Sequence, residues 1–309
     1  MLICRATDFD FPALPFAEWN GSKEYLHHIL QMVGKVRLSL HPKLNHWWHV
    51  TLYPSTRGLT TGLIPYCGRD FEIEVDLQLH QINLHFSEGP SRHISLGDSS
   101  VAEVYSELFQ QLEERQFPIT IHAHPYLLQD KTPFSANTAK PDYNPLYVQR
   151  YHQVLNEISN IFQEFRGRYN GKASPVHWFW HSFDLAYTRF SGRKAPPRTT
   201  GTRVDQEAYS HEEISFGFWP GDNNFPEAAF YAYCYPHPDG LTDQLLQPEK
   251  AIWGELNGSP YGFLLYEDMR NSANPRLALL EFLESFYQAA AKQAGWPVEE
   301  LSTTALAHT

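Results

Sequence analysis

Two similar aromatic motifs recur in the sequence, and this repetition constrains the fold more than any other feature. The first, HWWHVTLY, starts at His46, and the second, HWFWHSFD, starts at His177, 131 residues later. A Thr-Arg pair follows each motif and ends at Arg57 and at Arg189. An amphipathic helix pattern precedes each motif, and strand-like segments and another helix pattern follow it. The order helix, strands, helix thus occurs twice, through an internal duplication or through convergence on a common pattern.

The segments between the helix patterns alternate apolar and polar residues. The alternation is clearest over residues 71–79 and 82–86 in the first copy, and over 214–219 and 228–235 in the second. A period of two is typical of half-buried antiparallel strands. We therefore predict an α+β fold of two related units, each a mostly antiparallel sheet with helices packed on one face.

Helix-start signals and irregular stretches predict the domain boundaries. Ser100 with Glu103 reads as a capping box, and Asn274 reads as an N-cap before a proline. We predict a first unit over residues 1–127, whose last strand covers 119–123, an irregular proline-containing linker over 128–146, and a second unit over 147–309. Residues 192–206 are expected to form an irregular basic insertion in the second unit.

Composition limits the class of protein and its partners. The chain has 309 residues, of which 15% are aromatic and 19% charged, so a large buried core is expected. A net charge of −11 argues against nucleic acid and anionic membranes as partners, and no run approaches the roughly 18 apolar residues of a membrane span. Cys4, Cys67 and Cys234 form no pair motif, and each is expected to be a small buried side chain. Together with an N-terminus that lacks a secretory-signal pattern, this predicts a cytoplasmic protein.

Five segments resemble the signature of the bacterial DUF5996 family. They are NHWWHVTLYPSTRGLTT, FEIEVDL, SPVHWFWHSFDLAYTRFSGRKAPP, AYSHEEISFGFWPG and FYAYCYP. They occur in the order of the family signature, and the similarity extends from about Phe11 to Trp296. The family has no assigned function, so the resemblance implies a coherent bacterial domain and supplies no catalytic residues. This chain departs from the family pattern at His181, where a small residue is common in the family. The departure weakens any mechanism that requires His181.

Strand parity places candidate ligand-binding aromatics on faces directed away from the core. Read as strands, the two motifs and the later strands direct the following residues outward: Trp47, His49, Glu72, Trp178, Trp180, Asp184, Trp219, Tyr231 and Tyr233. Such faces are either solvated or the walls of a cleft, and packing in the core is the alternative for the tryptophans. The functional interpretation rests on aromatics, carboxylates and imidazoles falling on the same faces.

One basic segment stands out against the negative net charge. It contains Arg189, Arg193, Lys194, Arg198 and Arg203, and no acidic residue lies among them. Arginines beside aromatic rings suit an anionic ligand with a planar part. Alternatively, these cations pair with surface acids, or Arg189 and its counterpart Arg57 hold the two halves together.

The sequence contains no signature of a catalytic nucleophile, of a P-loop or of a dinucleotide-binding loop. General acid/base chemistry is compatible with His49 or His211 as the proton carrier and Glu72, Asp184 or Glu212 as orienting groups. No metal site is predicted, because His46 and His49 fall on opposite strand faces and the pair His122 and His124 has no third ligand.

The leading hypothesis is a protein that binds a small anionic or aromatic ligand in a cleft bearing aromatic, histidine and carboxylate side chains, with acid/base catalysis left open. Its ligand-binding set comprises Arg57, Arg189, Arg193, Lys194, Trp47, Trp178, Trp180, Trp219, Tyr231 and Tyr233. The rival is a non-catalytic module whose aromatic face forms a homo-oligomer or partner interface. The sequence identifies no cofactor.

Overall fold

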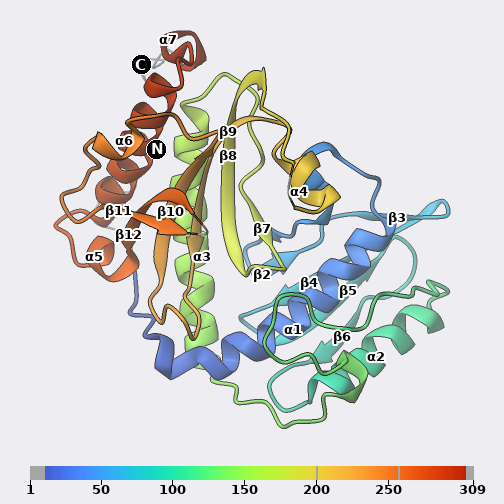
Figure 1. The fold of residues 1–309 in the computed structure, drawn as a ribbon. Coiled ribbons are helices and arrows are strands. Elements are labelled where there is room, and N and C mark those ends of the chain that lie inside the picture. Colours follow the sequence, from blue (N-terminus) through green and yellow to red (C-terminus); the bar gives the residue numbers. More distant parts are fainter. Residues whose placement is uncertain (1–10, 200, 257, 304–309) are drawn as a thin grey trace, which may run out of the picture. The chain divides into compact units, whose positions relative to one another are not determined.

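The computed structural model describes residues 11–199, 201–256 and 258–303. It has an α+β fold with helices and two antiparallel sheets of six strands each (Figure 1). The described residues form two compact units. The first unit contains residues 14–156 and 178–184, and the second contains residues 11–13, 157–177 and the chain from 185 onward. The α+β prediction is confirmed.

The first unit combines long helices with a sheet in the order β1-β2-β4-β5-β6, in which β3 also pairs with β4. Its elements are α1 (Phe16–Leu40), the 3-10 helix η1 (Asn45–Val50), β1 (Tyr53–Pro54), β2 (Gly58–Thr60), β3 (Ile64–Tyr66), β4 (Arg69–Asp76), β5 (Gln81–Phe86), β6 (Arg92–Ser95), α2 (Val101–Glu114), η2 (Phe134–Ala136) and the start of α3 (Pro145–Gly167).

Local sequence signals form these elements as predicted. On β4, Phe71, Ile73 and Val75 are buried while Glu72 and Glu74 between them are half-buried, which is the alternation of a strand with one core face. The α2 helix begins with the predicted capping box, in which the Ser100 hydroxyl accepts from the Glu103 N–H and the Glu103 carboxylate accepts from the Ser100 N–H.

Two predicted strands of the first unit are wrong. The HWWHV motif forms η1 instead, because His46 and Trp47 adopt left-handed backbone angles with φ of 52° and 60°. Residues 119–123 form no strand, and side chains of α1 hold this stretch and the residues after it. The Lys35 ammonium donates to the carbonyls of His122 and His124 at 3.0 and 2.6 Å.

The second unit has a sheet in the order β11-β12-β10-β9-β8-β7. Its elements are the rest of α3, the start of β7 (His177–Phe179), nearly all of β8 (Asp184–Lys194), α4 (Arg203–Ala208), β9 (His211–Trp219), β10 (Ala229–Tyr235), η3 (Leu241–Asp243), β11 (Ile252–Leu256), β12 (Ser259–Leu265), α5 (Tyr266–Arg270), α6 (Pro275–Gln293) and α7 (Val298–Leu301). The predicted basic insertion is not irregular throughout, because β8 continues to Lys194 and α4 begins at Arg203.

Aromatic packing joins the sheet of the second unit to its helices. The Phe216 ring of β9 makes edge-to-face contacts with Phe165 of α3 and Phe286 of α6, at centroid separations of 5.0 and 6.1 Å. The α6 helix starts as predicted, since the Asn274 side chain accepts from the Leu277 N–H and proline follows it. Among the described helices, none is both long and apolar enough to cross a membrane.

The cysteine predictions have mixed outcomes. Cys234 is a buried free thiol, as expected. Cys67 is exposed, so the prediction that it is buried is wrong; it lies in the β3–β4 turn with a φ of 48°. Cys4 lies outside the described residues.

Candidate functional site

Strands β9 and β10 together form a face rich in tyrosine. In their antiparallel register, Glu213 lies opposite Tyr235 and Ser215 lies opposite Tyr233. Side chains two residues apart on a strand point to the same side, and β12 continues this face with Phe263 opposite Tyr231. We call the following set the tyrosine face: Glu213, Ser215, Trp219, Tyr231, Tyr233, Tyr235, Tyr261 and Phe263. The sequence-predicted residues Trp219, Tyr231 and Tyr233 therefore share one face.

The rings of the tyrosine face contact one another. The Tyr233 ring lies 5.1 Å from that of Tyr261 and 6.3 Å from that of Tyr231, with the second pair nearly parallel at 17°. Gly217 makes this packing possible, because a Cβ at that position would come 2.2 Å from the Tyr231 ring. The Tyr231 ring therefore rests directly on the β9 backbone, and the face is lined by ring surfaces.

Glu213 is the acidic group of the tyrosine face, and its side chain is buried. The residue is only 6% exposed. Burial raises the pKa of Glu213 to about 8, and the nearby cations Arg198 and Lys172 offset only part of this effect. Since a desolvated carboxyl is more stable in its neutral form, Glu213 is mainly protonated at pH 7.

The basic segment meets the tyrosine face at Arg198. Its guanidinium carbon lies 4.4 Å from the Tyr209 ring centroid and 5.3 Å from that of Tyr235, which are cation–π distances. The Tyr235 hydroxyl donates to the Pro196 carbonyl at 2.9 Å, and the hydroxyls of Tyr209 and Tyr233 are 3.3 Å apart. One guanidinium, several tyrosines and a neutral carboxyl are thereby gathered at the start of β9 and the end of β10.

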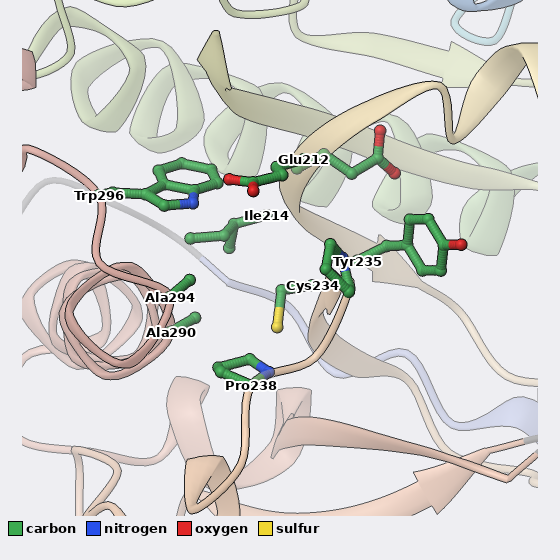
Figure 2. A pocket seen from close by; sticks show the side chains of 10 residues that line it. Glu212, Ile214, Cys234, Tyr235, Pro238, Ala290, Ala294 and Trp296 are labelled. Atoms are coloured by element: carbon green, nitrogen blue, oxygen red, sulfur yellow. The ribbon is translucent and has the colours of Figure 1, made fainter. Parts of the chain in front are cut away.

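A cavity of about 120 Å³ borders the same strand ends. Its walls are mostly apolar, and Figure 2 shows the Cys234 sulfur between β10 and the Ala290 side of α6, with Glu212 beside Trp296. Burial raises the pKa of the Cys234 thiol to about 12, so the thiol is neutral and unreactive at pH 7. The cavity therefore suits a small uncharged group.

Four residues of the sequence-predicted site lie around the start of β9, namely Arg193, Lys194, His211 and Glu212. Arg193 and Glu212 form an ion pair. The Arg193 guanidinium lies 2.7 Å from the Glu212 carboxylate and also donates to the Ala294 carbonyl at the C-terminal end of α6. Lys194 is exposed and pairs with His211 in the β8–β9 register. Burial lowers the pKa of His211, so its neutral form is favoured. Arg193 is thus engaged in structural contacts.

These contacts predict different effects for the two adjacent cations. Arg193→Ala should lower the free energy of unfolding by about 1 kcal/mol, because it removes a partly exposed ion pair and a charged hydrogen bond at a helix end. Lys194→Ala should change it by less than about 0.5 kcal/mol. Urea unfolding of both variants measures the difference, and equal effects would show that the Arg193 contacts contribute nothing.

The structure places Arg189 in the core, away from the tyrosine face. Arg189 is 1% exposed, and its guanidinium carbon lies 3.6 Å from the Phe165 ring centroid, 4.3 Å from that of Tyr287 and 4.9 Å from that of Tyr169. Its Nη2 donates to the Phe165 carbonyl at 2.6 Å. Arg189 therefore serves as a buried cation within the second unit, surrounded by aromatic rings.

The outward orientation predicted for Trp178 and Trp180 is wrong. Trp178 is fully buried and donates its indole N–H to the Tyr151 hydroxyl at 3.0 Å. Trp180 is 6% exposed and donates to the Val50 carbonyl at 2.8 Å. The Trp180 ring lies against Gly34 of α1, where a Cβ would come within 2.1 Å of it. Both tryptophans are packing residues of the first unit.

Arg57, Glu72 and Asp184 form polar contacts inside the first unit. Arg57 Nε donates to the Asp76 carboxylate at 2.9 Å. Glu72 accepts a short hydrogen bond from the Thr60 hydroxyl, and the buried Asp184 accepts one from Ser182. These three residues belong to the first unit, whereas the tyrosine face belongs to the second.

Trp47 and His49 lie together in η1, with ring centroids 5.2 Å apart. Burial lowers the pKa of His49, and neither its Nδ1 nor the Trp47 indole N–H has a hydrogen-bond partner among the described residues. The rings of His122 and His124 are also 5.2 Å apart. No group of three or more histidine, cysteine or acidic side chains that could hold a metal occurs in the described ranges.

Sequence reasoning missed Glu213 and Tyr235 as site residues, and it named Arg198 in the basic segment without including it in the ligand-binding set. A signal for Glu213 was present, because it lies two residues before Ser215 and strand parity alone puts both on one face. No local signal shows that Tyr209 and Arg198 cover this end of the sheet.

Comparison with known proteins identifies the family of the chain. The model of a family of unknown function, DUF5996, matches residues 11–303. The chain belongs to this family. No curated protein and no solved structure matches the chain. The family model thus covers all but the ends of the chain, and it assigns no function to any residue.

Proposed function

We propose that this DUF5996 protein binds a small aromatic carboxylate at the end of the tyrosine face where Glu213 and Arg198 lie. The observation that carries the proposal is the burial of Glu213 with a pKa raised to about 8. Keeping an ionisable group where its charged form is disfavoured costs stability, and such groups concentrate at functional sites. Glutamine would fill similar space without this cost.

The ligand class follows from the charges and rings around Glu213. Tyr209, Tyr233 and Tyr235 supply surfaces for a planar group. Arg198 supplies a fixed positive charge, and Lys172 acts on Glu213 as a second nearby cation. A protonated Glu213 donates a hydrogen bond to a carboxylate, whereas an incoming ammonium group would be repelled by Arg198. An aromatic anion therefore fits better than an aromatic cation.

The proposal extends to acid/base chemistry, with Glu213 as the proton carrier in place of His49 or His211 and with no orienting role for Glu212. A group with a pKa close to neutrality can both give and accept a proton under physiological conditions. Glu212 is instead held in its ion pair with Arg193. We infer that Glu213 is the proton donor to a bound anion.

Benzoate is the probe that tests the proposed site. Because binding requires protonated Glu213, benzoate observed by saturation-transfer NMR should bind at least about tenfold more tightly at pH 6 than at pH 9. Glu213→Gln should keep binding and lose this pH dependence. Arg198→Ala should weaken binding about tenfold or more, and Arg198→Lys should restore part of it.

Arg203→Ala is the matched control for Arg198→Ala. Arg203 belongs to the same basic segment, but its side chain is 83% exposed and pairs with Glu207. This variant should bind benzoate as the wild type does. Binding of benzylamine in place of benzoate, or affinity that rises with pH, would overturn the proposal, because either result requires an ionised Glu213 that attracts a cation.

We also infer that the two units share an origin and that the protein works in the bacterial cytoplasm. In support of duplication, each unit has antiparallel strands followed by a long helix, α2 in the first and α6 in the second. The HWWHV motif forms η1 and its counterpart forms β7, so the two copies differ locally. The free thiols of Cys67 and Cys234 support a reducing compartment.

A further inference from the structure

Strand β11 is an edge of the second-unit sheet. It pairs along one side with β12, from Ile252 opposite Phe263 to Leu256 opposite Ser259, and no other described strand pairs with it. An edge strand presents backbone N–H and carbonyl groups that another strand can use. Its apolar side chains decide whether such pairing is favourable.

The apolar side chains of β11 are unusually exposed. Ile252 is 59% exposed and Leu256 is 48% exposed, and Leu245, near the strand, is 86% exposed. Trp253 points the other way and fixes β11 to its unit, since its ring packs on Phe286 and its indole N–H donates to the Gln244 carbonyl. Ile252, Gly254 and Leu256 therefore share the opposite side of a firmly held strand, where Ile252 and Leu256 are exposed and the Phe263 ring lies over Gly254.

We propose that β11 pairs antiparallel with β11 of a second copy of this chain, around a two-fold axis at Gly254. In this register Ile252 of each copy lies opposite Leu256 of the second copy, so both exposed side chains become cross-strand partners. Gly254 lies opposite its own equivalent and introduces no side chain at the axis. Glu255 lies opposite Trp253 of the second copy, which avoids a pair of like charges.

The neighbouring registers are less favourable. A shift in one direction places Glu255 opposite Glu255 of the second copy, which sets two carboxylates against each other. A shift in the other direction places Ile252 opposite Gly254 and Leu256 opposite Lys250 of the second copy, which leaves the apolar pairs unmade. The sequence of the strand thus selects the register centred on Gly254.

This contact forms a closed dimer. Both copies use the same strand, so the interface is isologous and adds no further copies. The opposite sheet edge is β7, a three-residue strand with a different sequence. Five residues per strand bury much less than the roughly 800 Å² per partner of a standard interface, so the dissociation constant should be on the order of tens of micromolar.

Cross-linking tests the predicted register directly. With Cys4 and Cys67 replaced by serine, the Ile252→Cys/Leu256→Cys variant should form covalent dimers under mild oxidation, because opposite residues place Cβ atoms within disulfide reach. Each single cysteine variant is the matched control and should form at least about tenfold less dimer. Equal cross-linking by a single variant would overturn this register.

The oligomeric state of the unmodified chain provides the second test. Sedimentation velocity at about 100 μM should show mainly dimer for the wild type and monomer for Ile252→Lys. Leu63→Lys is the control, because Leu63 is 64% exposed in the first unit and should leave the dimer intact. A monomeric wild type at this concentration, or equal dimerisation of Ile252→Lys, would refute the proposal.

Discussion

Replacing Glu213 with glutamine is expected to stabilise the protein by about 3–5 kcal/mol at pH 8 and to leave its stability near pH 4.5 almost unchanged. Burial raises the pKa of this carboxyl from 4.5 to about 8 in the folded protein. Between these values the unfolded chain is ionised at this position while the folded protein keeps its proton. Stability therefore falls by about 1.4 kcal/mol per pH unit as pH rises, and glutamine removes that fall. Urea unfolding at pH 4.5, 6 and 8 measures the effect.

Glu212→Gln is the control for this experiment because it changes the adjacent carboxyl on the other side of β9. Glu212 forms the ion pair with Arg193 and accepts a hydrogen bond from Ser191, so glutamine there should destabilise the protein at pH 8. If Glu213→Gln is also less stable than the wild type at pH 8, Glu213 is ionised in the folded protein and is stabilised by Arg198 or Lys172.

Much of the fold could be predicted because its signals are local. The capping residues Ser100 and Asn274 act within one helical turn, and the β4 alternation of Ile73 and Val75 with carboxylates needs only two-residue periodicity. These features form wherever the chain has such a sequence, and they correctly gave the α+β class.

The aromatic motifs could not be predicted because strand parity assumes an unbroken strand. Consecutive left-handed residues at His46 and Trp47 turn the first motif into a 3-10 helix, and Phe183, with a φ of 60°, bends the chain near the end of the second. Trp180 then points to α1, where Gly34 leaves room for its ring. Whether a tryptophan packs against a glycine far away in the sequence depends on the tertiary fold, which the local pattern does not show.

The candidate site was predicted in part. Parity correctly grouped Trp219, Tyr231 and Tyr233, but Glu212 was chosen and Glu213 overlooked. Two adjacent carboxyls differ in chemistry only through their surroundings. Glu212 forms an ion pair with Arg193, whereas Glu213 is buried near Arg198, which stacks on Tyr209. Such coverage depends on how a long connection folds back, which periodicity does not encode.

His27 is expected to make the stability of the first unit depend on pH at the acidic end of the range, as Glu213 does for the second unit at higher pH. It lies on α1, 6% exposed, with Nε2 hydrogen-bonded to the Trp180 carbonyl at 2.9 Å. Burial, reinforced by the charge of Lys23, lowers the pKa of His27 from 6.5 to about 3. The unfolded chain therefore takes up a proton at this position well before the folded protein does.

The stability that neutral His27 provides is complete above pH 6.5 and is lost as pH falls toward 3. Between pH 6.5 and 4 this histidine alone should cost about 3 kcal/mol, and His27→Gln, which cannot be protonated, should lose that much less stability over the same interval. Urea unfolding at both pH values measures the two losses. His93→Gln, at an exposed position on β6, should behave as the wild type does. Equal losses for His27→Gln and the wild type would show that the α1 core accepts a charged imidazole, through water entry or movement of the Trp180 carbonyl.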